Sequence, residues 1–288
     1  MASNKIAVAV IHGMGSQGKK TQGVDEISFS AGLYKRLKEH MGNQFFQRVG
    51  WREVFWADIL QSRQEDFIKD NLAAKGARWM KTRRFVMHNL ADAASYRRNK
   101  GDVRDQIYHR IHARVHQTIA RLEEITDANT PLVILAHSLG GHIMSNYIYD
   151  MMKGDPEVAA GSDFQQLKTV AGFVTFGCNI PVFSFAYKPE DIHPIKYPGT
   201  NIPQSKRLHP WWVNMNDKDD ALGMPLAGTS PGYQALVASG HLDDRWIDSG
   251  GALEFWNPAS HNGYWTDRHF YRPTATILRN AMGIGPVT

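Results

Sequence analysis

The sequence predicts an α/β protein with a mostly parallel central sheet and helices on both faces. Short aliphatic runs alternate with segments of helical period, and this order is typical of parallel sheets. The runs at residues 6–11, 131–137 and 170–177 are almost wholly apolar. Strands that are covered on both faces read in this way. A chain of 288 residues can form one such domain, and we expect a single domain over residues 1–288.

The remaining elements follow from hydrophobic period and turn residues. Further strands are expected at residues 47–59, 211–216 and 246–256. Helices are expected at residues 25–41, 103–125, 140–152 and 266–282, the first with apolar residues at four-residue spacing from Phe29 to Met41. The stretches 181–210 and 222–240 are rich in proline or glycine and are expected to form loops.

Residues 61–100 are polar and basic, and we interpret them as a helical insertion that forms a cap or lid. The net charge of +5 is concentrated around this insertion. Residues 71–121 contain twelve Lys and Arg against three Asp, so the rest of the chain is acidic overall. The apolar residues of the insertion, Trp79, Phe85 and Leu90, could shape an acyl pocket or contact anionic lipid. No nucleic-acid-binding motif accompanies the charge, and nucleic acid is not an expected partner.

Cysteine content and hydropathy indicate the cellular setting. The single cysteine, Cys178, excludes an intramolecular disulfide and fits a reducing compartment. The apolar run at residues 6–11 is too short for a signal sequence, and no stretch approaches the ~20 apolar residues of a membrane span. We expect a soluble, cytoplasmic protein.

The most informative motif is the serine turn at residues 136–141. The apolar run 131–137 ends at Ser138, and a helical sequence follows at once. A serine between a strand and a helix is held in a strained conformation, which requires small residues nearby. Ala136, Gly140 and Gly141 meet that requirement. The turn would present the hydroxyl beyond the end of the strand, where a substrate carbonyl can reach it.

This turn resembles the nucleophile elbow G-x-S-x-G of the α/β-hydrolase family, in particular its lipase-like and serine-esterase members. Ala136 replaces the first glycine of the motif, and some small bacterial lipases of the family resemble this chain in that respect. The resemblance implies the α/β-hydrolase fold, with Ser138 as the nucleophile of acyl transfer. It also implies the chain order of serine, then acid, then histidine.

A serine hydroxyl needs a base to remove its proton. The histidines downstream of Ser138 are His193, His209, His241, His261 and His269. His261 lies in a turn-forming loop before the last helix, a place that resembles that of the family's catalytic histidine. His241 is the main alternative.

The base in turn needs a carboxylate to orient it. The strand expected at residues 211–216 runs into an acidic turn that contains Asp217, Asp219 and Asp220. The family places its acid at this strand end, often followed by one residue and then an aliphatic, and Asp220 fits that pattern best. Asp217 is the alternative acid because it is nearest the strand end, and Asp219 is the third candidate.

The developing oxyanion needs hydrogen-bond donors. The first strand ends in His12, Gly13, Met14 and Gly15, which resembles the H-G-x-G segment of lipases and esterases. The resemblance implies backbone N–H donors at Met14 and Leu139. The same glycines lack the G-x-G-x-x-G spacing of a dinucleotide site, and no cofactor is expected.

Three histidines, His109, His112 and His116, share one helix face. They lack an intervening Glu and an evident fourth ligand, so helix packing explains them better than zinc, and no metal is expected. The sequence therefore predicts a serine hydrolase that cleaves a carboxylic ester through an acyl-enzyme on Ser138. Thioesterase or amidase activity with the same triad is an alternative. Another is a non-catalytic protein that docks on membranes or proteins through its basic insertion.

Overall fold

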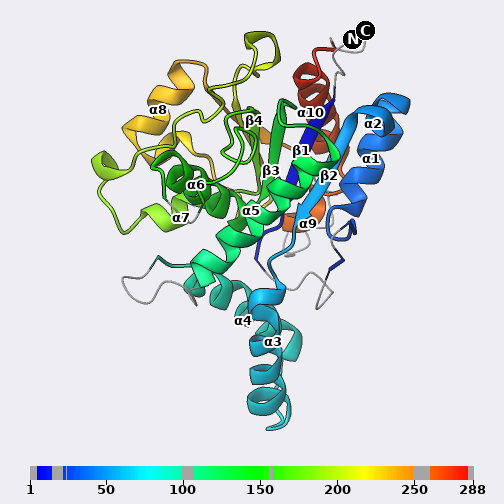
Figure 1. Cartoon of the computed structure of the whole chain (residues 1–288). Coiled ribbons are helices and arrows are strands. Elements are labelled where there is room, and N and C mark those ends of the chain that lie inside the picture. Colours follow the sequence, from blue (N-terminus) through cyan, green and yellow to red (C-terminus); the bar gives the residue numbers. More distant parts are fainter. Residues whose placement is uncertain are drawn as a thin grey trace.

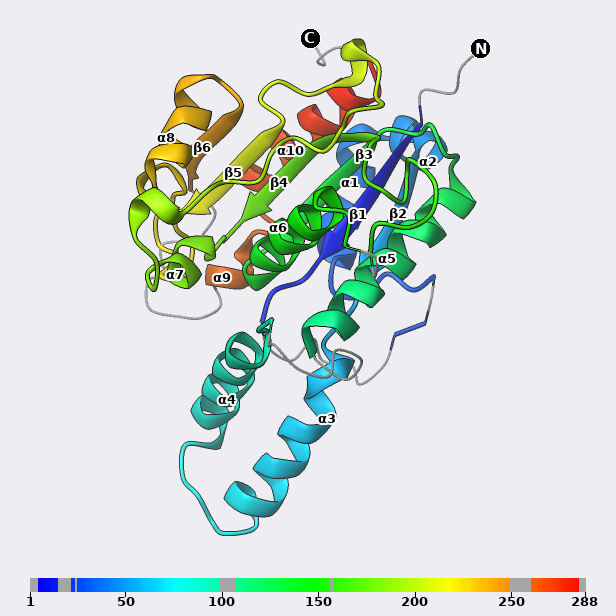
Figure 2. The same cartoon turned by 60° about the vertical axis from the view of Figure 1, so that its left-hand side comes forward.

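A parallel sheet of six strands forms the centre of the molecule (Figure 1), in the order β2-β1-β3-β4-β5-β6 (Figure 2). The computed structural model describes residues 5–14, 22–23, 25–98, 107–155, 158–248 and 260–284. The strands are β1 (Ile6–Ile11), β2 (Val49–Val54), β3 (Leu132–His137), β4 (Val170–Phe176), β5 (Trp212–Asp217) and β6 (Leu242–Ile247). Every pair of neighbouring strands is parallel. All six strands therefore end at one edge of the sheet, the carboxyl edge.

The apolar side chains of the central strands alternate between two cores, one on each face of the sheet. In β1, Ala7 and Ala9 belong to one core, whereas Val8 and Val10 belong to the other. This alternation explains why the central strands are apolar throughout. The chain adds β2 on one side of β1 and all later strands on the other side. Such a reversal of strand order opens a crevice at the carboxyl edge between β1 and β3.

Helices cover both faces of the sheet (Figures 1 and 2). One core contains side chains of α5 and α6, and the other contains side chains of α1 and α10. The helices of the body are α1 (Ala31–Met41), α2 (Asn43–Arg48), α5 (Ile107–Ile125), α6 (Leu139–Met152), α7 (Ile180–Ser184), α8 (Pro231–Ala238), α9 (Ser260–Gly263) and α10 (Arg268–Ala281). Short 3-10 turns occur at Pro189–Asp191, Gln204–Lys206 and Ala227–Thr229. None of the described helices is long and apolar enough to cross a membrane.

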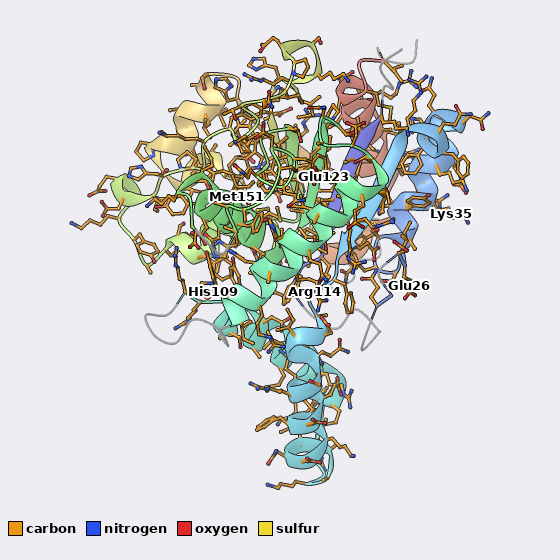
Figure 3. All side chains as sticks on the ribbon, in the orientation of Figure 1. Glu26, Lys35, His109, Arg114, Glu123 and Met151 are labelled. Atoms are coloured by element: carbon orange, nitrogen blue, oxygen red, sulfur yellow. The ribbon has the colours of Figure 1, made fainter. Side chains whose placement is uncertain are left out.

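The insertion after β2 forms a helical hairpin that projects from the body (Figure 2). It consists of α3 (Asp58–Phe67), a π-helical turn (Ile68–Ala73) and α4 (Met80–Ser95). Figure 3 shows Arg114 on α5 beside its base. There the Arg114 guanidinium forms an ion pair with Asp58 at 3.0 Å and donates to the carbonyl of Phe55.

Buried polar side chains join the two helices of the hairpin. The Gln64 amide donates to Asp92 at 2.6 Å, and its carbonyl oxygen lies 2.6 Å from His88 Nδ1. His88 Nε2 lies 2.9 Å from Glu65, which also pairs with Arg84 at 2.8 Å. These bonds help to hold α3 and α4 together. The role of the hairpin as a cap or lid stays a prediction.

The structure corrects several expected elements. The first helix begins at Ala31 instead of residue 25, and the expected strand 47–59 is confined to Val49–Val54. Residues 222–240 are not all loop, because Ser230 caps α8 by accepting a hydrogen bond from the Tyr233 amide, with Pro231 in the first turn. The last strand lies at Leu242–Ile247, earlier than the predicted 246–256. Residues 249–256 of that prediction and residues 103–106 lie outside the described residues.

Candidate functional site

Ser138 lies between β3 and α6 in a strained backbone conformation. Its φ of 53° and ψ of −126° lie in a region that non-glycine residues rarely adopt. The Ser138 amide donates to the carbonyl of Phe176 on β4, and its carbonyl accepts from the Gly141 amide, which fixes the turn on both sides. The hydroxyl is buried and makes no hydrogen bond to any described residue. A buried polar group without a partner is costly and points to a functional position.

Glycines surround the serine because the neighbouring backbones approach too closely for side chains. A Cβ at Gly13 would lie 2.4 Å from Ser138 Cβ and 3.0 Å from Ser138 Oγ. A Cβ at Gly140 would lie 2.7 Å from the carbonyl oxygen of His12. The end of β1 therefore packs directly against the serine turn. Gly141 contacts Cys178, whose thiol is buried with its pKa raised by burial to about 12 and therefore stays protonated.

His261 and Asp220 form a hydrogen-bonded pair at the carboxyl edge. His261 Nδ1 lies 3.0 Å and 2.9 Å from the two carboxylate oxygens of Asp220. Asp220 comes from the turn after β5, and His261 from α9 in the segment after β6. The Asp220 side chain is buried, whereas that of His261 is 12% exposed. The geometry leaves the other ring nitrogen of His261, Nε2, without an Asp220 contact.

Several donors hold the Asp220 carboxylate in place. Burial by itself would raise the pKa of Asp220, but hydrogen bonds from His261, the Leu222 amide and the Tyr264 hydroxyl outweigh burial and lower it. The Leu222 amide lies 2.9 Å from Oδ1, and the Tyr264 hydroxyl lies 2.8 Å from Oδ2. Asp220 is therefore ionised at neutral pH and can stabilise a positive charge on His261.

Asp217 and Asp219 have other positions. Asp217 Oδ1 accepts from the Asp219 amide at 2.6 Å, and the Asp217 amide donates to the Tyr264 hydroxyl at 2.8 Å. Asp217 thus shapes the turn that carries Asp220. The structure places Asp220 against His261, and neither Asp217 nor Asp219 has a described contact with that ring.

His137 ties His261 to the serine turn. His137 Nε2 lies 2.7 Å from the His261 carbonyl oxygen, and the two rings lie 4.6 Å apart. Burial and the neighbouring His261 lower the pKa of His137 well below its ordinary value, so this ring is neutral and donates through Nε2. Because His137 precedes Ser138 directly, the contact brings His261 to the end of β3. The structure describes no hydrogen bond between the Ser138 hydroxyl and His261.

His12 fixes the loop that carries the expected first oxyanion donor. Its Nε2 accepts from the Trp56 amide at 3.1 Å, and its Nδ1 lies 2.7 Å from the Gly13 carbonyl oxygen. The Trp56 indole donates back to the His12 carbonyl, and the two rings stack at 4.8 Å. Burial lowers the pKa of His12 to about 3. A neutral ring with Nε2 as acceptor carries its proton on Nδ1, which donates a hydrogen bond to the Gly13 carbonyl.

The two expected oxyanion donors lie at the ends of the elements that meet at Ser138. Leu139 begins α6, and amides in a first helical turn have no carbonyl partner within the helix. Met14 follows Gly13 and packs against the core that contains α5 and α6. Gly15 of the predicted glycine segment lies outside the described residues.

The alternative histidines lie elsewhere. His241 precedes β6, so it lies near the opposite edge of the sheet from Ser138, and its ring lies 5.5 Å from that of His209. His269 pairs with Asp267 at 3.2 Å, and His193 lies in the loop before β5. Among the described residues, none of these three histidines contacts His137 or Asp220, as His261 does.

The three histidines of α5 belong to a polar cluster between helices. His112 Nε2 lies 2.8 Å from the Tyr96 hydroxyl, and His116 Nδ1 lies 3.0 Å from that of Tyr147. His109 packs edge-on against Tyr108. No group of three or more potential metal ligands occurs among the residues that the structure describes.

Sequence reasoning missed two groups that hold the site together, Tyr264 and His137. His137 stands directly before Ser138 in the serine turn, and Tyr264 stands three residues after His261. Their residue types gave no signal, because an aromatic beside a loop histidine is compatible with ordinary core packing. Only the folded turn shows that Tyr264 bonds to Asp220.

Buried neutral histidines predict acid sensitivity. Burial lowers the pKa of His12 and His112 to about 3, and that of His142 to about 4. The unfolded chain binds protons at these residues below pH ~6.5, whereas the folded chain does not, so stability falls as the pH falls. Three such groups give a slope of up to about 4 kcal/mol per pH unit near pH 5.

Thermal unfolding between pH 7 and pH 4.5, followed by circular dichroism, measures this slope. His142→Gln should reduce the slope by up to about 1.4 kcal/mol per pH unit, because it removes one such group. Replacement of the exposed His40 by Gln is the control. Equal slopes for the wild type and His142→Gln would contradict the assignment of acid sensitivity to these buried rings.

Comparison with known proteins gives likeness in structure only. No protein-family model matches the chain, and no curated protein sequence matches it. A cutinase-like protein from Cryptococcus sp. is similar at 9% identity and a TM-score of 0.42, over 98% of this chain and 97% of that one. A candidate hydrolase of the α/β superfamily from Xanthomonas campestris pv. campestris has 12% identity and a TM-score of 0.38, over 94% and 98%. A candidate carboxylesterase from Lactobacillus plantarum has 10% identity and a TM-score of 0.38, over 98% and 87%.

The strand order and the position of the serine define the fold of the chain. Its strand order reverses once, beside the strand that leads into the serine turn. Helices that pack on both faces connect the parallel strands, and the strained serine stands at the resulting switch point. The chain thus has the expected α/β architecture, a parallel sheet of six strands covered by helices on both faces, with the serine at the switch point.

Proposed function

We propose that the protein is a serine hydrolase that cleaves a carboxylic ester. The observation that carries the proposal is the His261–Asp220 pair, held against the residue that precedes an unpartnered, strained serine. Three hydrogen-bond donors, His261 Nδ1, the Leu222 amide and the Tyr264 hydroxyl, hold one buried, ionised carboxylate behind one imidazole. A purely structural turn would not need this arrangement.

In the proposed reaction, Ser138 Oγ attacks the acyl carbon while His261 Nε2 accepts its proton. Asp220 keeps the proton of Nδ1 in place and stabilises the imidazolium. The amides of Met14 and Leu139 stabilise the oxyanion. The imidazolium then protonates the leaving alcohol, and the acyl group stays on Ser138. Water, activated by the same histidine, releases the acid and restores the serine.

Hydrolysis of short p-nitrophenyl esters by the wild type and by Ser138→Ala tests the proposal. Ser138→Ala should retain no activity above the buffer rate, with an unchanged circular dichroism spectrum. Matched thioester and anilide substrates decide between esterase and the alternative thioesterase or amidase activities. Absence of turnover on all three substrate classes would contradict a hydrolase and favour the non-catalytic docking protein.

We further propose that the end of the hairpin farthest from the body contacts anionic membranes. The segment 69–84 carries six Lys and Arg against one Asp. Lys75, Arg78 and Arg83 are exposed there, and the indole of Trp79 is 79% exposed. Basic side chains attract anionic headgroups, and tryptophan favours the boundary between headgroups and acyl chains. The hairpin follows β2, so it extends from the same carboxyl edge as the candidate site.

The structure limits which cations are available for such a contact. Arg84 pairs with Glu65, and Arg98 pairs with Asp150 at 2.8 Å and Asp155 at 2.9 Å. Trp79 lies directly before α4, in the turn that joins it to α3, and its side chain is exposed. The side chains of Phe85 and Leu90 lie outside what the structure describes.

Cosedimentation with phosphatidylcholine vesicles, with and without phosphatidylglycerol, tests the contact. The triple variant Lys75→Glu, Arg78→Glu, Arg83→Glu should lower binding to anionic vesicles by roughly 100-fold or more. The control, Lys35→Glu, Arg36→Glu, Lys38→Glu on α1, changes the net charge equally but lies away from the hairpin (Figure 3). Equal losses in both triple variants, or binding to neutral vesicles alone, would contradict the proposal.

A further inference from the structure

A hollow lies on the face of the sheet that α10 covers, away from the serine turn. Its volume is about 920 Å³. It is lined by the loop before β5, by α10 and the residues after it, and by single residues of α1, β5 and β6. Ser138, Asp220 and His261 do not line it. It is therefore distinct from the candidate active site.

Four arginines line this hollow, which we call the arginine hollow. Arg207 precedes β5, Arg245 lies on β6, and Arg272 and Arg279 lie on α10. His40 and His209 add two further groups that can become positive. None of the lining residues, all of which the structure describes, is acidic. Positive groups from three segments repel one another unless an anion is present between them.

The helical spacing of α10 directs one polar face into the hollow. Arg272, Thr276, Arg279 and Gly283 follow at intervals of four, three and four residues, and all four line it. Residues at this spacing share one side of a helix. The opposite side of α10 is buried in the core through Phe270 and Leu278. The α10 wall thus offers two guanidinium groups and a hydroxyl on one surface.

The Arg207 environment leaves one buried donor available, and the other arginines make contacts of their own. Arg207 packs over the Tyr197 ring at 4.7 Å and donates to the Gly199 carbonyl, while its buried Nε has no described hydrogen-bond partner. Arg245 pairs with Asp243, and burial lowers its pKa. Arg279 donates to Gln44 at 2.8 Å. Each of these contacts uses part of a guanidinium fork that carries five N–H donors.

Apolar side chains form another part of the wall. Leu208, Val213, Ile277 and Ile284 line the hollow beside the arginines. Guanidinium groups match phosphate oxygens in a two-pronged geometry, and several of them around one hollow suit more than one phosphoryl group. Apolar walls next to them suit an organic portion of the same ligand.

We propose that the arginine hollow binds a small organic molecule that carries two or more phosphoryl groups. The hollow lies near the beginning of β5, whereas Asp220 follows its end. Binding there does not require Ser138 and does not depend on the proposed ester hydrolysis.

Isothermal titration calorimetry with the full chain at low salt tests the proposal. The probes are orthophosphate, pyrophosphate, ATP and citrate. Pyrophosphate should bind saturably and more tightly than orthophosphate, because two phosphoryl groups contact more guanidiniums. ATP should bind at least as tightly as pyrophosphate, because its organic portion contacts the apolar walls. Citrate distinguishes phosphoryl from carboxylate recognition.

Arg272→Gln and Arg207→Gln should each weaken pyrophosphate binding at least about 10-fold. Arg110→Gln, an exposed arginine on α5, is the matched control and should bind as the wild type does. Arg272 is exposed, so its replacement leaves the core intact. Absence of saturation below 10 mM, equal binding by all three variants, or citrate binding as tight as pyrophosphate would each overturn the proposal.

Discussion

Replacing Asp220 with asparagine is expected to lower esterase turnover by roughly 10³–10⁴-fold. An asparagine keeps the shape of the side chain but removes the charge that stabilises the His261 imidazolium. Its amide can also donate to Nδ1, which places the imidazole proton on the wrong nitrogen. Because Asp220 contacts His261 through both oxygens, no rotation of the amide restores the original pair.

Asp217→Asn is the matched control for this prediction. The Asp217 carboxylate accepts from the Asp219 amide, and an asparagine oxygen can accept the same bond. Turnover should therefore stay near that of the wild type. The pH dependence of turnover in both variants gives a second measurement. A large loss in Asp217→Asn with a small loss in Asp220→Asn would exchange the two assignments.

Gly13→Ala is expected to have the second largest effect. The added methyl group would lie 2.4 Å from Ser138 Cβ, so either the end of β1 or the serine turn must move. Overpacking of this kind costs about 1–3 kcal/mol in the free energy of unfolding. Movement of the Met14 amide should also lower turnover by about 10²-fold, the effect of losing one oxyanion donor.

Chemical denaturation and ester hydrolysis measure both consequences of Gly13→Ala. Gly228→Ala is the control, because a Cβ there meets no atom within 4 Å. Unchanged turnover in Gly13→Ala would show that the loop between β1 and α1 does not contribute a donor at Met14.

The sheet and the serine turn could be predicted because their signals are local. Each central strand is a short apolar run, and the elbow needs small residues within a few positions of Ser138. The helix α8 was missed despite its Ser230 and Pro231 start signal, since glycines and prolines on both sides suggested a loop. Strand β6 was expected later in the chain than it lies. It is an edge strand, and its polar residues interrupt the apolar pattern that marks the central strands.

The choice among Asp217, Asp219 and Asp220 could not be made from the sequence with the same security. All three lie within four positions, and only the folded turn, with Tyr264 bonded to one carboxylate, separates them. The arginine hollow had no local signal at all. Arg207, Arg245 and Arg272 are distant in the sequence and meet only because β5, β6 and α10 are neighbours in the fold.

The most direct test of the central claim is covalent labelling with a fluorophosphonate, followed by mass spectrometry of peptides. The proposed activation of Ser138 by His261 predicts one adduct, on the peptide that contains Ser138, and slow labelling in His261→Ala. Ser138→Ala should give no adduct at all. Labelling of Ser138→Ala at the wild-type rate, or an adduct on another residue, would contradict the assignment of Ser138 as the nucleophile.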